Sequence, residues 1–245
     1  MGFSSWRFAA TYDRFCAGAE ENGLGAHRAA LLSGAQGTTL EIGGGTGANL
    51  GHYGTDVDTL TVTEPDRAML KRLERKVADR GRTVAGRPVT VLRAPAEDLP
   101  FEDATFDTVV STIVLCSVDD QPRALRELRR VLRPGGQLLF LEHVRSDDPQ
   151  LARHQDRMNW LNRLVVLCDC NRPTLQGIEA AGFTVTRLER TTMPNVPRFV
   201  APVVVGAATA PTSQPPVSAA GSGLQDGLEP VQGGDLGPHR AADHR

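Results

Sequence analysis

Short β-rich runs alternate with amphipathic helical segments over most of this chain, and this alternation restricts the fold more than any other feature. Strands that are separated by helices pair in parallel, and helices then cover both faces of the sheet. The sequence therefore predicts an α/β fold with a seven-stranded, mostly parallel sheet and helices on both faces. The predicted strands are residues 38–43, 59–64, 89–94, 106–115, 136–143, 183–190 and 199–206.

The last two predicted strands differ from the others in their connection. Only a short, proline-containing connection, with the sequence MPNVP at 193–197, is available to join them. A crossover between parallel strands needs a dozen or more residues, usually a helix. We therefore expect these two strands to form an antiparallel hairpin at the edge of the sheet.

Two helices have clear signals in the sequence. Residues 66–79 and residues 122–132 both carry apolar residues at helical spacing, with charged residues on the other face. Pro122 suits the first turn of the second helix, and Asp119 or Asp120 is the expected cap. The sequence RPGG that follows this helix should end it and turn the chain into the next strand.

The composition changes near the C-terminus. The chain has 245 residues, but residues 207–245 contain no aromatic residue and no lysine, and they are rich in Ala, Pro, Gly and Ser. Such a segment cannot bury enough apolar surface to offset the entropy of ordering it. We expect one folded domain over residues 1–206 and a disordered tail over 207–245.

Charge and cysteine content exclude several classes of protein. The net charge of −2 gives no bulk attraction to nucleic acid or anionic lipid, so no nucleic-acid partner is expected. Cys16, Cys116, Cys168 and Cys170 show no CxxC spacing, so we expect neither a disulfide framework nor a metal site. No apolar run is long enough for an integral membrane segment, which predicts a cytoplasmic protein.

A glycine-rich loop follows the first predicted strand. Four glycines lie within residues 43–47, where they should open a helix and let backbone N–H groups approach a ligand closely. Glu64 ends the second strand, where a carboxylate can accept hydrogen bonds from a ribose diol. The loop also fits G-x-G-x-x-A as Gly43, Gly45 and Ala48, so a dinucleotide site remains open.

The glycine loop and Glu64 suit either NAD or S-adenosyl-L-methionine, and Glu41 decides between these two ligands. It lies inside the first strand, two residues before the glycines, where a carboxylate is costly unless it is paired. It could hold the loop through backbone N–H groups, or face a ligand that carries an ammonium and a sulfonium. A pyrophosphate would be repelled. Glu41 therefore favours S-adenosyl-L-methionine (SAM) over NAD as the cofactor.

Further motifs follow along the chain. They comprise E-x-G-x-G-x-G at 41–47, Glu64, AEDLPF at 96–101, FDTVV at 106–110 and LRPGG at 132–136. This series resembles that of the class I SAM-dependent methyltransferases, whose fold is Rossmann-like. Within them it resembles the methyltransferase type 11 group, which includes the ubiquinone/menaquinone C-methyltransferases.

A closer resemblance is to the thiol methyltransferase-like family. It rests on GGGTGANL at 43–50, VLCSVDD at 114–120, FLEHVR at 140–145 and CDCNRPT at 168–174, and the likeness extends over residues 6–205. The resemblance implies that residues 1–35 form lid helices of the methyltransferase domain. It implies SAM-binding roles for Tyr12, Glu41, Gly43, Gly45, Gly47, Glu64, Pro65, Ala96, Glu97, Leu115 and Cys116.

Methyl transfer from a sulfonium needs a positioned acceptor, and it needs a general base only where the acceptor must lose a proton. His143, at the end of the fifth predicted strand, is the first candidate for such a base; a structural histidine bonded to the backbone is the alternative. His154 is the second candidate. The stretch 151–170 could form the wall of an apolar substrate pocket or a helix packed on the sheet.

The leading hypothesis is a SAM-dependent methyltransferase that acts on a small-molecule acceptor. The acceptor could be a thiol, a phenol or quinone, or another metabolite, and the resemblance alone favours a thiol. One alternative is an NAD(P)-binding Rossmann oxidoreductase that uses the G-x-G-x-x-A pattern. The other is a catalytically silent SAM-binding protein. The sequence carries no signal for an oligomeric state.

Overall fold

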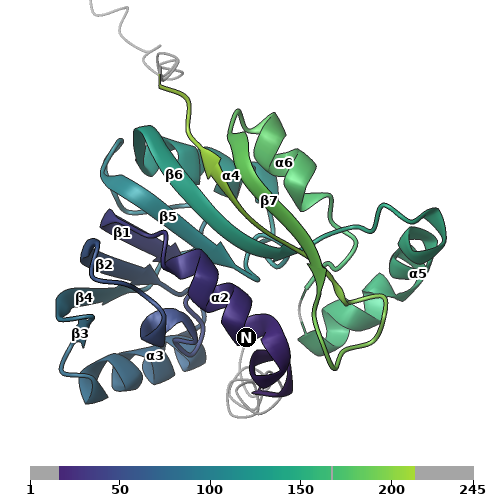
Figure 1. Ribbon diagram of the computed structural model, residues 1–245, viewed down its shortest axis with the longest axis horizontal. Helices are drawn as coiled ribbons and strands as arrows, with labels where there is room; N and C mark the ends of the chain where they lie inside the picture. The colour runs from purple at the N-terminus through teal and green to yellow at the C-terminus, as the bar shows by residue number, and fades with distance from the viewer. Residues whose placement is uncertain (1–16, 167, 213–245) are drawn as a thin grey trace, which may run out of the picture. The chain divides into compact units, whose positions relative to one another are not determined.

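The computed structural model describes residues 17–166 and 168–212, which contain one eight-stranded sheet in the order β3-β4-β2-β1-β5-β6-β8-β7 (Figure 1). The strands are β1 (Gly37–Ile42), β2 (Val57–Thr63), β3 (Thr83–Val84), β4 (Arg87–Leu92), β5 (Phe106–Thr112), β6 (Leu132–His143), β7 (Thr184–Thr192) and β8 (Pro202–Thr209). The helices are η1 (Glu20–Leu24), α2 (Gly25–Leu32), η2 (Asn49–Gly51), α3 (Arg67–Asp79), α4 (Gln121–Val131), α5 (Pro149–Val166) and α6 (Thr174–Ala180).

The predicted seven-stranded sheet is confirmed. Strands β4, β2, β1, β5 and β6 pair in parallel, while β8 pairs antiparallel with both β6 and β7. The eighth strand, β3, has two residues and pairs antiparallel with the outer side of β4. Such a short strand carries no hydrophobic pattern of its own, so the sequence did not reveal it.

The predicted hairpin is also confirmed, and its two strands have different places in the sheet. Strand β8 is mostly buried and lies between β6 and β7, whereas β7 is mostly exposed and forms the edge. Their side chains explain this order. An apolar strand such as β8 needs cover on both faces, and the charged residues Arg187, Glu189 and Arg190 of β7 protect an edge from further pairing.

Two apolar layers cover the two faces of the sheet. In β6, Leu138 and Phe140 face the layer that contains α4 and α6, while Leu139 and Leu141 face the layer that contains α2 and α3. This alternation follows from the two-residue period of a strand. The chain turns from β1 to β2 on one side and reaches β5 on the other, so β1 lies at the point where the strand order reverses.

Helix α4 begins as its sequence predicts. Asp120 is the cap, because its carboxylate accepts the backbone N–H of Arg123 at 2.9 Å, and Pro122 lies in the first turn. Its apolar face is fully buried against the sheet, whereas the arginines between those residues face outward. The predicted helix over 66–79 corresponds to α3, which Asp66 caps through the N–H groups of Ala68 and Met69.

Three features of the structure differ from the sequence prediction. Strand β8 continues to Thr209, and Ala208 and Ala210 are buried, so the change in composition at 207 does not mark the end of the sheet. The glycine loop leads only into the three-residue helix η2 rather than a full helix. Within the predicted lid region, α2 packs on a face of the sheet through Leu31 and Leu32, which are fully buried.

The packing of α4 gives a first prediction. Leu128 is fully buried between α4 and the sheet, so Leu128→Ala should lower the free energy of unfolding by about 2–5 kcal/mol. Arg126→Ala, on the exposed face of the same helix, should change it by less than about 0.5 kcal/mol. Urea unfolding followed by circular dichroism measures both. Equal effects of the two changes would contradict the assigned packing face.

Candidate active site

The five parallel strands end at one edge of the sheet, and their following loops bring most of the predicted site residues to that edge. In an open α/β sheet, this carboxyl edge is where ligands bind. Tyr12 lies outside the described residues. The predicted residues at or just beyond the strand ends are Gly43, Gly45, Gly47, Glu64, Pro65, Ala96, Glu97, Leu115, Cys116 and His143.

The glycine loop has one position that is open and others that are closely packed. Gly43, Gly45 and Gly47 have positive φ angles of 56°, 55° and 80°, which favour glycine. A Cβ atom on Gly44 would lie 2.3 Å from Cγ1 of Val62, so this glycine serves internal packing. A Cβ atom on Gly45 would meet nothing within 4 Å. Gly45 therefore presents its backbone to open space, as a ligand-binding glycine must.

Glu64 joins the end of β2 to this loop. Its Oε2 accepts the N–H of Gly45 at 2.8 Å, and its Oε1 accepts the N–H of Asp66 at 2.8 Å. Burial raises the pKa of the Glu64 carboxyl, and the two backbone donors oppose this shift. Each carboxylate oxygen has a second lone pair, so the group can still accept two hydroxyl donors beside Gly45.

Glu41 holds the loop in a different way from either sequence expectation. Its Oε2 accepts the hydroxyl of Tyr53 at 2.6 Å, and its Oε1 accepts the amide of Asn49 at 2.9 Å; Asn49 in turn accepts from Arg28 of α2. The partners are side chains rather than backbone N–H groups. Leu40 and Ile42 face the layer that contains α4 and α6, and side chains alternate along a strand. Glu41, which lies between them, therefore points to the opposite layer, under the loop and toward α2. Burial raises its pKa, while Tyr53 and Arg28 oppose this.

The loop after β4 is tied to the start of α4. Ala96 is buried, and Glu97 accepts the N–H groups of Asp119 and Asp120 at 2.9 and 3.3 Å through one oxygen. Asp119 is therefore part of this connection rather than the cap of α4. A surface cavity of about 380 Å³ lies here, lined by Pro95, Glu97, Asp98, Asp119, Asp120 and Arg123.

Glu142 organises the loop after β5, and it was not among the predicted site residues. It is fully buried in β6 and accepts four hydrogen bonds, from the hydroxyl of Ser111 at 2.6 Å and the N–H groups of Val114, Leu115 and Cys116 at 3.0, 3.1 and 3.3 Å. Burial raises the pKa of Glu142, and these donors oppose the shift. A charged residue within the apolar run LLFLEH was the available signal.

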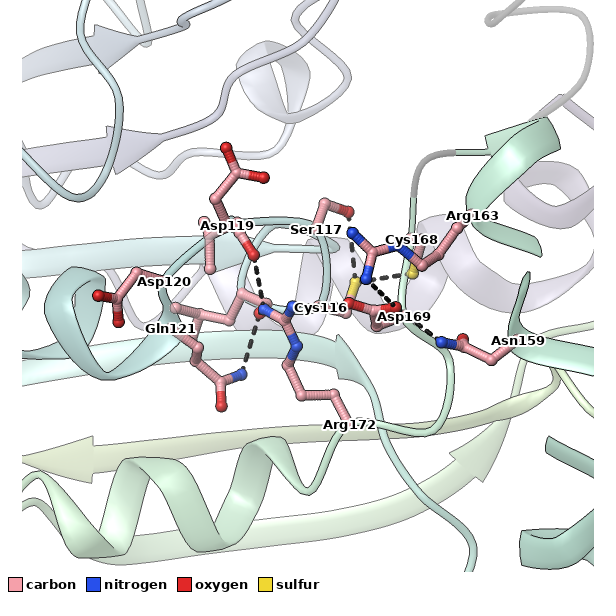
Figure 2. A network of polar contacts seen from close by, with 12 residues as sticks. Cys116, Ser117, Asp119, Asp120, Gln121, Asn159, Arg163, Cys168, Asp169 and Arg172 are labelled. Atoms are coloured by element: carbon pink, nitrogen blue, oxygen red, sulfur yellow. Dashed lines mark hydrogen bonds and ion pairs between the residues drawn. The ribbon is translucent and has the colours of Figure 1, made fainter. Parts of the chain in front are cut away.

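Arg172 holds the same loop from its other side (Figure 2). Its guanidinium donates to the carbonyl oxygens of Leu115 at 3.0 Å and Val118 at 2.7 Å, and it pairs with Asp169 at 2.7 Å. Asp169 also donates its N–H to the carbonyl of Cys116 at 2.9 Å. The segment 168–172 therefore fixes the loop after β5.

Comparisons with known proteins agree with this geometry. A model of the "Methyltransferase domain" family matches residues 40–140. Human "Thiol S-methyltransferase TMT1B" is 35% identical over 183 residues, which are 72% of this chain and 73% of that protein. The chain belongs to the class I SAM-dependent methyltransferases.

Two further comparisons concern more distant relatives. "Ubiquinone/menaquinone biosynthesis C-methyltransferase UbiE" of Idiomarina loihiensis is 40% identical over 106 residues, which are 42% of this chain and 41% of that protein. A Thermotoga maritima structure, titled a SAM-dependent methyltransferase and "possible histamine N-methyltransferase", has a TM-score of 0.61 and 22% identity. The match covers 84% of this chain and 97% of the Thermotoga chain, and it shows the shared fold.

SAM is the co-substrate of this family, and the residues of the methyltransferase fit such a ligand. Gly45 opens its backbone to a ligand, and Glu64 beside it keeps lone pairs for hydroxyl donors. None of the comparisons supports the NAD(P)-dependent alternative.

Among the helices of the described residues, none has the length and apolar character needed to cross a membrane.

The two candidate bases of the methyltransferase lie in very different surroundings. His143 is buried, and its Nδ1 lies 3.2 Å from Sγ of Cys168, while its Nε2 has no hydrogen-bond partner among the described residues. Its ring is therefore next to a thiol rather than bonded to the backbone. His154 is exposed on α5, where its ring packs edge-on against Phe199 at a centroid distance of 5.5 Å.

Helix α5 contacts the site through amides rather than apolar side chains. Trp160 and Leu164 are 66% and 73% exposed, so they neither pack on the sheet nor line an apolar pocket wall. Instead, Gln155, Asn159 and Asn162 bond to the segment 168–170, at distances of 2.6–2.8 Å. These amides have i, i+4, i+7 spacing, which places them on one helix face. This row of amides is a sequence signal for the contact face of α5.

The role of Glu142 leads to a second prediction. In Glu142→Gln, the side-chain NH₂ would replace an acceptor beside the loop N–H groups, so the free energy of unfolding should fall by about 1–3 kcal/mol. Glu179→Gln, an exposed change on α6, is the matched control and should stay within about 0.5 kcal/mol. Thermal and urea unfolding measure the difference. A Glu142→Gln variant as stable as the wild type would show that the carboxylate does not hold the loop.

Proposed function

We propose that this methyltransferase transfers the methyl group of SAM to a small-molecule acceptor at the carboxyl edge of the sheet. The observation that carries the proposal is the pairing of Gly45 with Glu64. An open backbone position and a carboxylate with remaining lone pairs lie within one hydrogen bond of each other, at the strand-order reversal. This combination suits a nucleoside whose ribose meets Glu64 while its charged chain runs along the glycine loop.

The remaining contacts follow from the order of the strand ends. Gly43, Gly45 and Gly47 would line the amino-acid part of SAM, and Pro65 would lie beside the adenine. Ala96 and Glu97 would lie near the adenine edge, close to the acidic cavity that Asp98 and Asp119 help to line. Leu115 and Cys116 would border the transferable methyl group. Tyr12 would contact SAM from the N-terminal region.

SAM supplies a methyl group on a sulfonium, which is an activated leaving group. The chain then has to hold the acceptor in line with that methyl group and exclude water. The loop after β5 suits this role because Glu142 and Arg172 fix its backbone from two sides. Glu41 acts indirectly, since it holds Asn49 and Tyr53 beneath the glycine loop.

A thiol is the acceptor class that we propose. Human TMT1B and TMT1A, at 35% and 33% identity, are named thiol S-methyltransferases. A cysteine-type thiol has a pKa near 8.5, so a useful fraction ionises near neutral pH without a strong base. This matters because His143 is buried against Cys168. His143 remains the candidate base only if the acceptor reaches its Nε2, which has no partner in the described part of the chain. His154 is a candidate only from the exposed surface.

Labelled SAM tests the reaction itself. The purified protein should transfer the label to a cysteine-type thiol faster than to a phenol or a quinol of similar size, because the cysteine-type thiol, with a pKa near 8.5 against about 10 for a phenol, ionises more readily. Product analysis by mass spectrometry identifies the methylated atom. A faster reaction with the phenol or quinol would overturn the thiol assignment while keeping the methyltransferase. SAM binding without transfer to any acceptor would favour a silent SAM-binding protein.

Glu64 should determine cofactor affinity. Hydrogen bonds to a charged group contribute about 1.5–3 kcal/mol, so Glu64→Gln should weaken the binding of SAM and S-adenosylhomocysteine by roughly 10- to 100-fold. Glu74→Gln, on an exposed face of α3, should leave affinity unchanged. Isothermal titration measures the affinities, and circular dichroism checks the fold. Equal affinities of the two variants would remove Glu64 from the binding site.

Adjacent glycines allow ligand binding to be separated from folding. A Cβ atom on Gly45 points into open space, so Gly45→Ala should block SAM while costing only the strain of a positive φ, about 1–2 kcal/mol. Gly44→Ala would place Cβ against Val62 and should mainly lower the melting temperature. Thermal unfolding with and without S-adenosylhomocysteine measures both effects. Strong ligand stabilisation of Gly45→Ala would contradict the assigned cofactor position.

A further inference from the structure

Two cysteines and a histidine that are distant in the sequence meet at the carboxyl edge of the sheet. Cys116 lies in the loop after β5, His143 ends β6, and Cys168 follows α5. The Sγ atoms of Cys116 and Cys168 are 3.1 Å apart, and Nδ1 of His143 lies 3.2 Å from Sγ of Cys168. One donor atom from each residue lies within 4.8 Å of the others, and all three residues are buried. Figure 2 shows the two sulfur atoms facing each other.

Hydrogen bonding alone leaves this cluster incomplete. Thiols are weak donors and weak acceptors, so the contacts between the three side chains satisfy them poorly. Nε2 of His143 is buried and has no partner among the described residues. Nδ1 is the ring nitrogen that faces the sulfur atoms, so an ion among them would bind Nδ1 and would not use Nε2.

The backbones that carry the three side chains are firmly held. The N–H of Cys116 donates to Glu142, and its carbonyl accepts from Asp169. The carbonyl of Cys168 accepts from Asn162 at 2.6 Å, and the carbonyl of His143 accepts from the hydroxyl of Thr174 at 3.1 Å. Such surrounding hydrogen bonds are typical of metal sites, where they orient the ligands.

The donor set selects the kind of ion. Two sulfur atoms and an imidazole nitrogen are soft or borderline ligands, which suit Zn²⁺ or Cu⁺ and not Mg²⁺ or Ca²⁺. In a tetrahedral zinc site, bonds of about 2.3 Å place two sulfur ligands roughly 3.8 Å apart. The sulfur atoms of Cys116 and Cys168 would have to separate by a fraction of an ångström. Two thiolates also neutralise a divalent ion, which a buried site requires.

We propose that Cys116, His143 and Cys168 bind one Zn²⁺ ion through two thiolate sulfurs and one imidazole nitrogen. Binding releases the two thiol protons to solvent and involves no change in oxidation state. Three protein ligands leave the fourth position to water or another exogenous donor. The proposal does not depend on the methyl acceptor, and it departs from the sequence expectation of no metal site.

Cys170 provides a matched control within the same segment. Cys170 is buried and lies two residues after Cys168 in the sequence. Its thiol faces the side-chain oxygen of Asn159 at 3.7 Å and is not part of the cluster. Cys170→Ser therefore tests for non-specific effects of removing a buried thiol. Cys116→Ser and Cys168→Ser each remove one proposed ligand.

Metal titration of the full-length protein tests the site. The protein is reduced, stripped with a chelator and titrated with Zn²⁺ against a chromogenic competitor, and Co²⁺ serves as a spectroscopic probe. We expect one equivalent of Zn²⁺ and a tetrahedral Co²⁺ spectrum with thiolate charge-transfer bands. Cys116→Ser and Cys168→Ser should each lose at least tenfold in Zn²⁺ affinity, whereas Cys170→Ser should bind as the wild type does.

A second measurement needs no variant, which matters if a serine variant fails to fold. Alkylation of the wild type at intermediate urea concentration, followed by peptide mass mapping, reports each cysteine separately. Zn²⁺ should protect Cys116 and Cys168 more strongly than Cys170. The proposal is overturned if Zn²⁺ fails to bind, if it protects the cysteines equally, or if only Cu⁺ binds. SAM affinity measured on the same samples tests the methyltransferase proposal separately.

Discussion

Buried carboxylates at the carboxyl edge are the constraint on which the site depends. Glu41, Glu64 and Glu142 are each enclosed by protein, where a carboxylate is costly unless its oxygens accept hydrogen bonds. Glu64 and Glu142 meet this requirement by binding a loop that follows a neighbouring strand, and Glu41 meets it by binding side chains that follow its own strand. Glu64 binds the glycine loop, Glu142 binds the loop after β5, and Glu41 binds side chains beneath the glycine loop. The cost of burying the charge therefore fixes the shape of the loops.

This arrangement separates groups that support the loops from groups that remain available to a ligand. Glu41 and Glu142 lie inside the protein, at 2% and 0% exposure, and their hydrogen bonds to Asn49, Tyr53 and the loop after β5 support the site from beneath. Glu64 is different, because it keeps lone pairs next to the open position at Gly45. A pre-formed site of this kind binds its ligand with little reorganisation, which is the condition for in-line transfer.

Local patterns predicted the fold well, while partners distant in sequence were not predictable. The β-rich runs and the 3.6-residue period predicted the main strands and helices, and Asp120 was among the expected caps. The inner place of β8 depends on its neighbours, although its apolar sequence is consistent with that place. Glu41 was singled out correctly as unusual, but its partners Tyr53 and Arg28 depend on which face of β1 it occupies. The amide contacts of α5 were not predicted, because its apolar residues were taken as its contact face.

The cysteine–histidine cluster shows the same limit in its sharpest form. Rules for metal sites in a sequence look for ligands a few residues apart, whereas Cys116 and Cys168 are 52 residues apart and His143 lies between them. The parallel pairing of β5 and β6 brings Cys116 and His143 to the same edge, and the segment after α5 brings Cys168 to them. An ion bound there would fasten the loop that Glu142 and Arg172 already hold. Because Leu115 and Cys116 are also the residues proposed beside the methyl group, metal occupancy and acceptor geometry would be coupled through a single turn.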